Sequence, residues 1–164
     1  MAGIKSIDTD ATGFKIVRDA VLALLNEFPD LDSKILFGVL DEDGGISMES
    51  EVGALVVAEG VDIVGGVHRQ CQFPFLVVYR GDSTNELQKL HISAMLDNLG
   101  SWLCREPDAD TVAQWPTLTG GRQITRITRD NVYAVVPNEN MTQDWCLPVT
   151  VFYTHDYTRR NYLG

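Results

Sequence analysis

Cysteine and histidine are the side chains of this sequence best suited to nucleophilic chemistry, and their spacing does not favour it. His68 and Cys71 lie three residues apart in a predicted strand, so alternation places them on opposite faces of a sheet. His91 and Cys104 lie in one predicted helix, about 20 Å apart along its axis at 1.5 Å per residue. The sequence therefore predicts no Cys–His nucleophile pair, and Cys71 is interpreted as a buried thiol that packs as a small hydrophobic group.

No short motif of a catalytic, cofactor or metal site is present either. The chain lacks GxGxxG, GxxxxGKS/T, HExxH and GxSxG, and its three cysteines have no CxxC spacing that would indicate zinc or a disulfide framework. The acidic run DEDGG at Asp41–Gly45 lacks the alternating ligands and the distal glutamate of a calcium loop, so a solvated turn is favoured. We predict no catalytic residue, no cofactor and no metal.

A cluster of arginines offers a second kind of site. Alternation along the predicted strand Arg122–Arg129 places Arg122 and Arg126 on one face with Ile124, and Arg129 on the other. A nucleic-acid surface is one interpretation, but such surfaces interleave bases with aromatic side chains, which this strand lacks. A solvated or subunit-pairing face is favoured.

The net charge of −10 is unevenly distributed along the chain. Residues 27–62 hold ten acids and the single base Lys34, whereas residues 117–164 hold five arginines and four acids. Such a surface disfavours sequence-specific nucleic-acid binding and docking on anionic lipid. Two oppositely charged regions suit head-to-tail assembly, although simple solubility explains the charge equally well. The acids proposed to face a neighbouring subunit or a lumen are Asp41, Glu42, Asp43, Glu49 and Glu51.

The strongest structural pattern is the strand Val67–Arg80 followed by a helix start. Its odd-numbered residues form one face, and from Phe75 onward both faces are apolar, which predicts a central strand that enters a two-sided core. Ser83 and Glu86 form a capping box, and the helix that follows, Thr84–Cys104, has an apolar surface wide enough to predict burial on most sides.

The remaining elements complete an α+β fold. A first helix begins at Thr12 and ends at Pro29, and a strand with Pro148 at an edge or a bulge covers Trp145–Thr154. We also predict a buried strand over residues 35–40, a tight turn at 41–45, an irregular or partly stranded segment at 53–66, and a hairpin over 122–136. The prediction is a mixed or mostly antiparallel sheet of five to seven strands with two main helices packed on it.

Length and hydropathy limit the architecture further. A chain of 164 residues suits a single domain over 1–164, with flexible tails at 1–11 and 157–164. No stretch approaches the roughly 20 apolar residues that span a bilayer, and the first residues lack the apolar run of a secretory signal. We expect the protein to act in the compartment in which it is made.

Four segments carry a family resemblance. They are DIVGGVHRQCQFPFLVVYRG, the helix end LDNLGSWL, WPTLTGGRQITRITRDN and DWCLPVTVFYTHDY. Taken in order over residues 12–157, they resemble the minor capsid or tail-terminator proteins of long-tailed bacteriophages and prophages.

The resemblance implies a structural role in the virion. Its members assemble into a ring, typically a hexamer, that caps the finished tail tube and joins it to the head connector. The implied partners are further copies of the chain, a tail tube protein and a head-connector protein, with DNA passing through the lumen. The implied location is the virion tail or neck, after assembly in the host cytoplasm. Another head–tail joining or neck adaptor protein, or a small enzyme with a site between subunits, remains an alternative.

Overall fold

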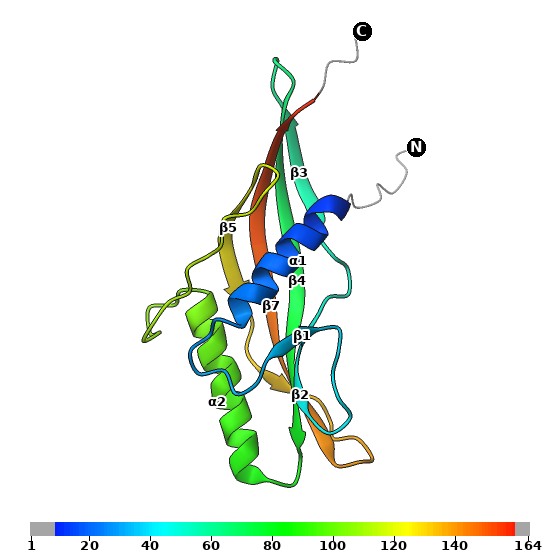
Figure 1. The fold of residues 1–164 in the computed structure, drawn as a ribbon, viewed down its shortest axis with the longest axis vertical. Helices are drawn as coiled ribbons and strands as arrows, with labels where there is room; N and C mark the ends of the chain where they lie inside the picture. The colour runs from blue at the N-terminus through cyan, green and yellow to red at the C-terminus, as the bar shows by residue number, and fades with distance from the viewer. Residues whose placement is uncertain (1–8, 160–164) are drawn as a thin grey trace.

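Two helices cover one face of a seven-stranded mixed sheet (Figure 1). The structure, a computed structural model, describes residues 9–159. The strand order is β1-β2-β4-β7-β5, and β3 pairs with β4 while β6 pairs with β7. The predicted α+β fold with two main helices is confirmed. The elements are α1 (Ala11–Leu25), β1 (Ile35–Phe37), β2 (Gly45–Glu49), β3 (Leu55–Val61), β4 (Gly66–Asp82), α2 (Glu86–Leu103), β5 (Arg122–Arg129), β6 (Tyr133–Ala134) and β7 (Thr142–Thr158).

Strands β4 and β7 form the axis of the molecule. Each contains 17 residues, and they pair along their whole length, from Gly66 opposite Thr158 to Asp82 opposite Thr142. At about 3.4 Å per residue, each strand spans roughly 55 Å. β4 lies between β2 and β7, with β3 beside its first half, which confirms the predicted central strand.

Strand β7 is also internal to the sheet, so the predicted edge position is wrong. Pro148 is accommodated because its carbonyl accepts a hydrogen bond from the amide of Asp130, which lies between β5 and β6. The carbonyl and nitrogen of one residue in an antiparallel strand point to the same side. The nitrogen of Pro148 therefore points to the gap between these two strands, where no donor is needed.

Strands β5 and β6 follow one another along β7 and are not paired with each other. The predicted hairpin over residues 122–136 is therefore wrong. The hydrogen bond from Asp130 to Pro148 keeps the chain beside β7 at the point where a hairpin would turn back.

The edge formed by β1 and β2 differs from its prediction as well. These strands are parallel, so Asp41–Gly44 belongs to a loop that carries the chain back to the start of β2 at Gly45, and the segment is not a hairpin turn. β1 has only three residues and ends at Phe37, and Leu36 is exposed because it points to the sheet face opposite the buried Ile35. The segment 53–66 contains β3, whose register shifts between Val56 and Ala58.

Both helices begin at a residue other than the predicted one. Asp10, not Thr12, is the N-cap of α1, and its side chain accepts a hydrogen bond from the amide of Gly13. Asn85 is the N-cap of α2, while the hydroxyl of Ser83 donates to the carbonyl of Met141. In both cases a carboxylate or amide oxygen replaces the hydroxyl that the sequence offered, and these side chains are equally good caps.

The core lies between the helices and the inner face of the sheet. Inward residues of β4 and β7 alternate as predicted, and the buried side chains of α2 pack on them. The predicted burial of α2 on most sides is wrong, because Leu87 and Leu90 are 79% and 69% exposed. The expected two-sided core is also incomplete, because Leu76 on the outer face of β4 is only half-buried. The main inner-face side chains are Cys71, Phe73, Phe75, Val77, Trp145, Leu147, Val149, Val151 and Tyr153.

A buried ion pair joins the start of α1 to the sheet. Arg122 donates from Nε and Nη2 to the two carboxylate oxygens of Asp10, at 3.0 and 2.8 Å, and the hydroxyl of Tyr153 donates to Asp10 at 2.8 Å. Asp10 and Arg122 are 4% and 7% exposed. A Cβ at position 13 would overlap both side chains, so only Gly13 fits this close approach.

These contacts also decide the charge state of Asp10. Burial raises the pKa of Asp10, but the hydrogen bonds from Arg122 and Tyr153 outweigh burial and lower the pKa to about 2. The carboxylate therefore stays ionised in the folded protein at neutral pH, paired with Arg122.

The structure describes only part of the predicted tails. In the described part of these tails, Asp10 is buried, and Tyr157 and Thr158 belong to β7. The folded region therefore extends further toward both ends than predicted. Residues 1–8 and 160–164 lie outside the described residues.

The Asp10–Arg122 ion pair predicts that the stability of the fold depends on pH in the acid range. The folded-state pKa of Asp10, about 2, lies below the ordinary value of 3.8, so the unfolded chain binds more protons between these values. The stabilisation is present above pH 4 and is lost as the pH falls toward 2. We expect Asp10→Asn to cost about 3 kcal/mol at pH 7 and to flatten this acid dependence. Urea unfolding between pH 2 and 7 measures both effects.

Asp108→Asn is the matched control, because Asp108 is an exposed acid on a loop. It should leave the stability and its pH profile unchanged. An Asp10→Asn variant as stable as the natural chain at pH 7 would show that the pair does not fasten α1 to the sheet.

Candidate functional site

The cysteines are placed as packing groups. Cys71 and Cys146 are buried, Cys104 is half-buried, and all three are free. Burial raises the pKa of each thiol, to about 12 for Cys104, so the reactive thiolate is disfavoured at neutral pH. His68 is exposed on the outer face of β4 while Cys71 faces the core, as alternation predicted.

Two of the three histidines contact carboxylates, and the third, His155, stacks on the ring of Tyr157. His91 lies 2.7 Å from Asp32, and His68 lies between Asp62 and Asp156. Within residues 9–159, no three histidine, cysteine or acidic side chains converge in an arrangement that could hold a metal ion. Across the same residues, no helix is long and apolar enough to cross a bilayer.

The three arginines of β5 are separated by the structure. Arg122 is buried against Asp10, and Arg129 donates to Glu106, Asp97 and Ser101. A shift of register between Ile124 and Arg126, which is a β-bulge at Thr125, turns Arg126 to the outer face. The predicted shared face of Arg122 and Arg126 is therefore wrong.

Only Arg126 of this group lies on the outer face of the sheet. Its guanidinium stacks on the ring of Phe152, 4.2 Å from the centroid. Arg122 and Arg129 already pair with acids of the same chain, whereas Arg126 forms no ion pair with another described residue.

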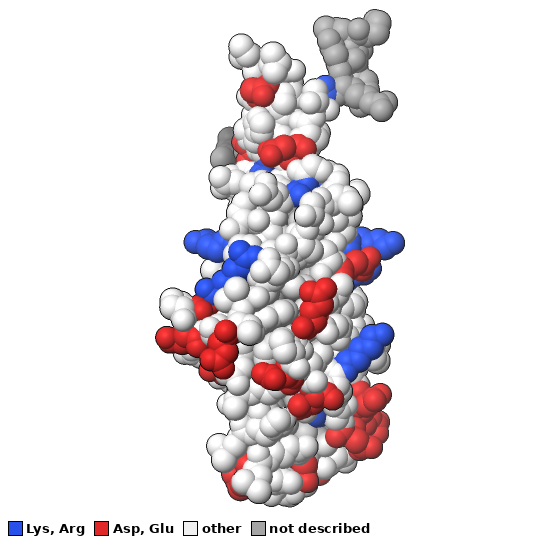
Figure 2. Space-filling model, turned by 60° about the vertical axis from the view of Figure 1, so that its left-hand side comes forward, with Lys and Arg blue, Asp and Glu red and all other residues white. Residues whose placement is uncertain are grey.

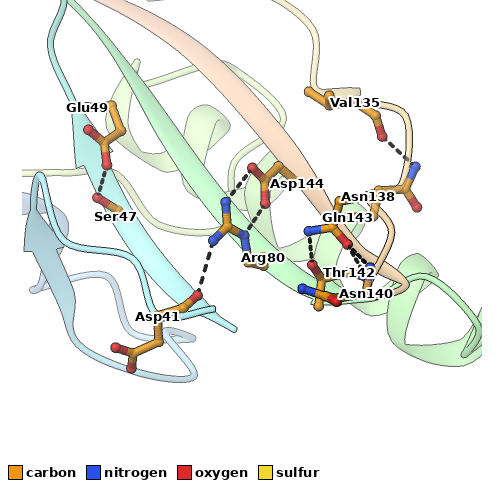
Figure 3. A network of polar contacts seen from close by, with 10 residues as sticks. All are labelled: Asp41, Ser47, Glu49, Arg80, Val135, Asn138, Asn140, Thr142, Gln143 and Asp144. Carbon is orange, nitrogen blue, oxygen red and sulfur yellow. Dashed lines mark hydrogen bonds and ion pairs between the residues drawn. The ribbon is translucent and has the colours of Figure 1, made fainter. Parts of the chain in front are cut away.

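The candidate acids lie in two places. Asp41, Glu42 and Asp43 are exposed on the loop between β1 and β2, and Arg80 holds this loop by donating to the carbonyl of Asp41 at 3.2 Å. Figure 3 shows the Asp41 carboxylate pointing away from Arg80, whose guanidinium pairs with Asp144 of β7. The backbone of the loop is therefore held by Arg80, and its carboxylates face the solvent.

Glu49 and Glu51 lie apart from that loop, beside a hollow on the outer face. The hollow has a volume of about 500 Å³ and an apolar floor made by Pro74 and Leu76 of β4 and by Pro148 of β7. We call it the acidic groove; its rim consists of Glu49, Glu51, Val52, Asp130 and Tyr133. The sequence alone does not connect Asp130 and Tyr133 with Glu49 and Glu51, because the rim is built by two segments, 49–52 and 130–133, that meet only in the fold.

A second exposed feature is the turn between β3 and β4, at the narrow end of the molecule (Figure 1). We call Val61, Ile63 and Val64 the apolar tip; they are 54%, 105% and 81% exposed. Figure 2 shows that much of this end is uncharged on one face, whereas acids gather over the lower half. Neighbouring exposed aliphatic side chains of this kind make the apolar tip a candidate contact site.

The turn that carries the apolar tip is well fastened. Asp62 accepts hydrogen bonds from the amides of Val64 and Gly66, at 3.0 and 2.7 Å. Gly65 has a φ of 86°, which glycine adopts without strain. His68 joins Asp62 to Asp156 at the end of β7, at 3.3 and 2.9 Å.

The opposite end of the molecule also displays exposed apolar side chains, among acidic ones. Leu87 and Leu90 project from the first turns of α2, and Val136 and Met141 project from the loop before β7, at 85% and 57% exposed. Ser83 connects these two segments by bonding to Met141. We call Leu87, Leu90, Val136 and Met141 the apolar base.

No protein-family model matches the chain, and no curated protein is significantly similar to it.

The hydrogen bonds of this turn predict a raised pKa for His68. Hydrogen bonds to Asp156 and then to Asp62 raise the pKa of His68 above 6.5. We expect Asp156→Asn to lower that pKa toward the ordinary value, because the first of these bonds weakens. NMR titration of the His68 ring measures it, with Asp108→Asn as control. An unchanged pKa in Asp156→Asn would show that His68 does not bridge the turn to β7.

Proposed function

We propose that this chain is a phage virion structural protein that caps the finished tail tube as a ring and joins it to the head connector. The observation that carries the proposal is that one subunit presents two unlike apolar surfaces, the apolar tip and the apolar base, at opposite ends of the β4–β7 ladder. The resemblance of four of its segments to tail-terminator proteins supplies the biological context.

Two unlike surfaces support a head-to-tail contact. A heterologous contact repeats from subunit to subunit and closes into a ring when the rotation between neighbours divides a full turn. An isologous dimer needs only one self-complementary patch. The separation of tip and base favours the ring, and a hexamer is the size that the resemblance implies.

The acidic loop suits the inner surface of such a ring. Asp41, Glu42 and Asp43 are exposed, and Arg80 holds the loop from its backbone. Carboxylates that face a lumen repel the phosphates of passing DNA, so the DNA slides without being held. In this proposal, the tail tube protein and the head-connector protein bind the two flat ends of the ring, in the virion neck, after assembly in the host cytoplasm.

The mass of the purified protein in solution tests assembly. We expect light scattering to find a ring, or a monomer–ring equilibrium that shifts with concentration and weakens with salt where charges contribute to the contact. A strict monomer at every concentration and salt would contradict spontaneous ring closure and would favour the neck adaptor alternative.

Substitutions in the apolar tip test directly whether this surface forms the subunit contact. We expect Ile63→Ser/Val64→Ser to abolish the ring while the free energy of unfolding changes by less than about 0.5 kcal/mol, because both side chains are exposed in the monomer. Light scattering and urea unfolding measure the two effects.

Val112→Ser is the matched control, because Val112 is an exposed valine on the loop before β5. It should leave both the mass and the stability unchanged. A ring that survives the double serine variant would remove the apolar tip from the subunit contact.

A further inference from the structure

We infer that the acidic groove binds the basic segment Arg159–Leu163 of a neighbouring copy of this chain. The inference rests on the self-assembly part of the proposed function and names the two surfaces that meet. It is carried by the chemistry of the groove, by the composition of the segment, and by the distance between them within one subunit.

The groove offers negative charge around an apolar floor. Glu49, Glu51 and Asp130 stand on its rim, and none of them forms an ion pair with another described residue. Tyr133 and Val52 of the same rim are 47% and 53% exposed. Unpaired carboxylates beside exposed apolar side chains fit an occupant that carries both positive charge and apolar groups.

The segment after β7 has this composition. Arg159 and Arg160 are the only adjacent pair of arginine or lysine residues in the sequence, and Tyr162 and Leu163 follow after Asn161. Arginine pairs with carboxylates through a planar fork, and tyrosine packs on proline and aliphatic surfaces at a low cost in side-chain entropy. No other stretch of the chain combines an adjacent pair of bases with an aromatic and an aliphatic side chain within five residues.

A subunit cannot fill its own groove with this segment. Thr150 lines the groove and Thr158 ends β7, so eight residues of strand separate them, roughly 27 Å at 3.3–3.4 Å per residue. Tyr162 lies four residues beyond Thr158 and reaches at most about 14 Å even when the chain is fully extended. The occupant therefore comes from another copy.

The same contact places the apolar tip at the interface. The amide of Arg159 donates to the carbonyl of Gly65 at 2.9 Å, so the segment leaves β7 directly beside the turn that carries Ile63 and Val64. A neighbour that inserts the segment also brings its apolar tip to this subunit. The charged segment selects the register of the contact, and the tip adds apolar burial.

A labelled peptide of residues 157–164, YTRRNYLG, tests recognition directly on the full chain. We expect saturable binding by fluorescence anisotropy, weakened about tenfold by Glu51→Gln/Asp130→Asn. The matched control Asp108→Asn/Asp110→Asn changes two exposed acids on another loop and should bind like the natural chain. Binding that is equal in both variants, or equal for a scrambled peptide, would overturn the inference.

Charge reversal tests the contact between whole subunits. We expect Arg159→Glu/Arg160→Glu and Glu51→Lys/Asp130→Lys each to weaken assembly alone, and an equimolar mixture of the two to recover it, because the reversed segment fits the reversed groove. Assembly of the segment variant at the natural level would overturn the inference and leave the proposed ring intact. A natural chain that stays monomeric but binds the peptide only through the unmodified groove would support the inference and contradict spontaneous ring formation.

Discussion

The seventeen-residue ladder between β4 and β7 is the constraint on which the rest of the molecule depends. No other strand within residues 9–159 is half as long, so the neighbours β2, β3, β5 and β6 each cover only part of the ladder. Both helices lie on one face of this ladder, and the Asp10–Arg122 ion pair fixes α1 there at a site that β7 completes with Tyr153. The core forms on the face that the helices cover, while the other face and the two ends of the ladder stay exposed to solvent.

That arrangement leaves unusual surfaces for a domain of this size. The turn at one end displays aliphatic side chains, the opposite end adds a second apolar group, and the outer face holds a groove with unpaired carboxylates. The apolar tip lies on a turn that Asp62 and His68 fasten, and the floor of the groove lies on β4 and β7, so these two surfaces need to gain little order when a partner binds. The free thiols among the described residues are buried or half-buried, and burial raises the pKa of each of them, so none is an activated nucleophile at neutral pH.

The sequence predicted the parts with strong local periodicity. Three patterns could be recognised because each lies within one element: the alternation of β4, the apolar face of β7 and the helical spacing of α2. Asp10 and Arg122 are 112 residues apart, so no pattern within a single element could predict their ion pair. The bulge at Thr125 reversed the expected side of Arg126, and the groove escaped prediction because β2, β4, β7 and the loop after β5 meet only in the fold. The exposure of Leu87 and Leu90 was missed because a wide apolar stripe looks the same whether a subunit or a partner covers it.

Electron microscopy of the assembled protein tests the central claim most directly, because it shows the symmetry of the contact and not only its mass. The account predicts closed rings with a central opening, in which the tip end of each subunit contacts the next subunit and the Asp41–Asp43 loop lines the opening. Two-fold dimers joined by identical patches, or open filaments in which the acidic loop faces outward, would contradict it.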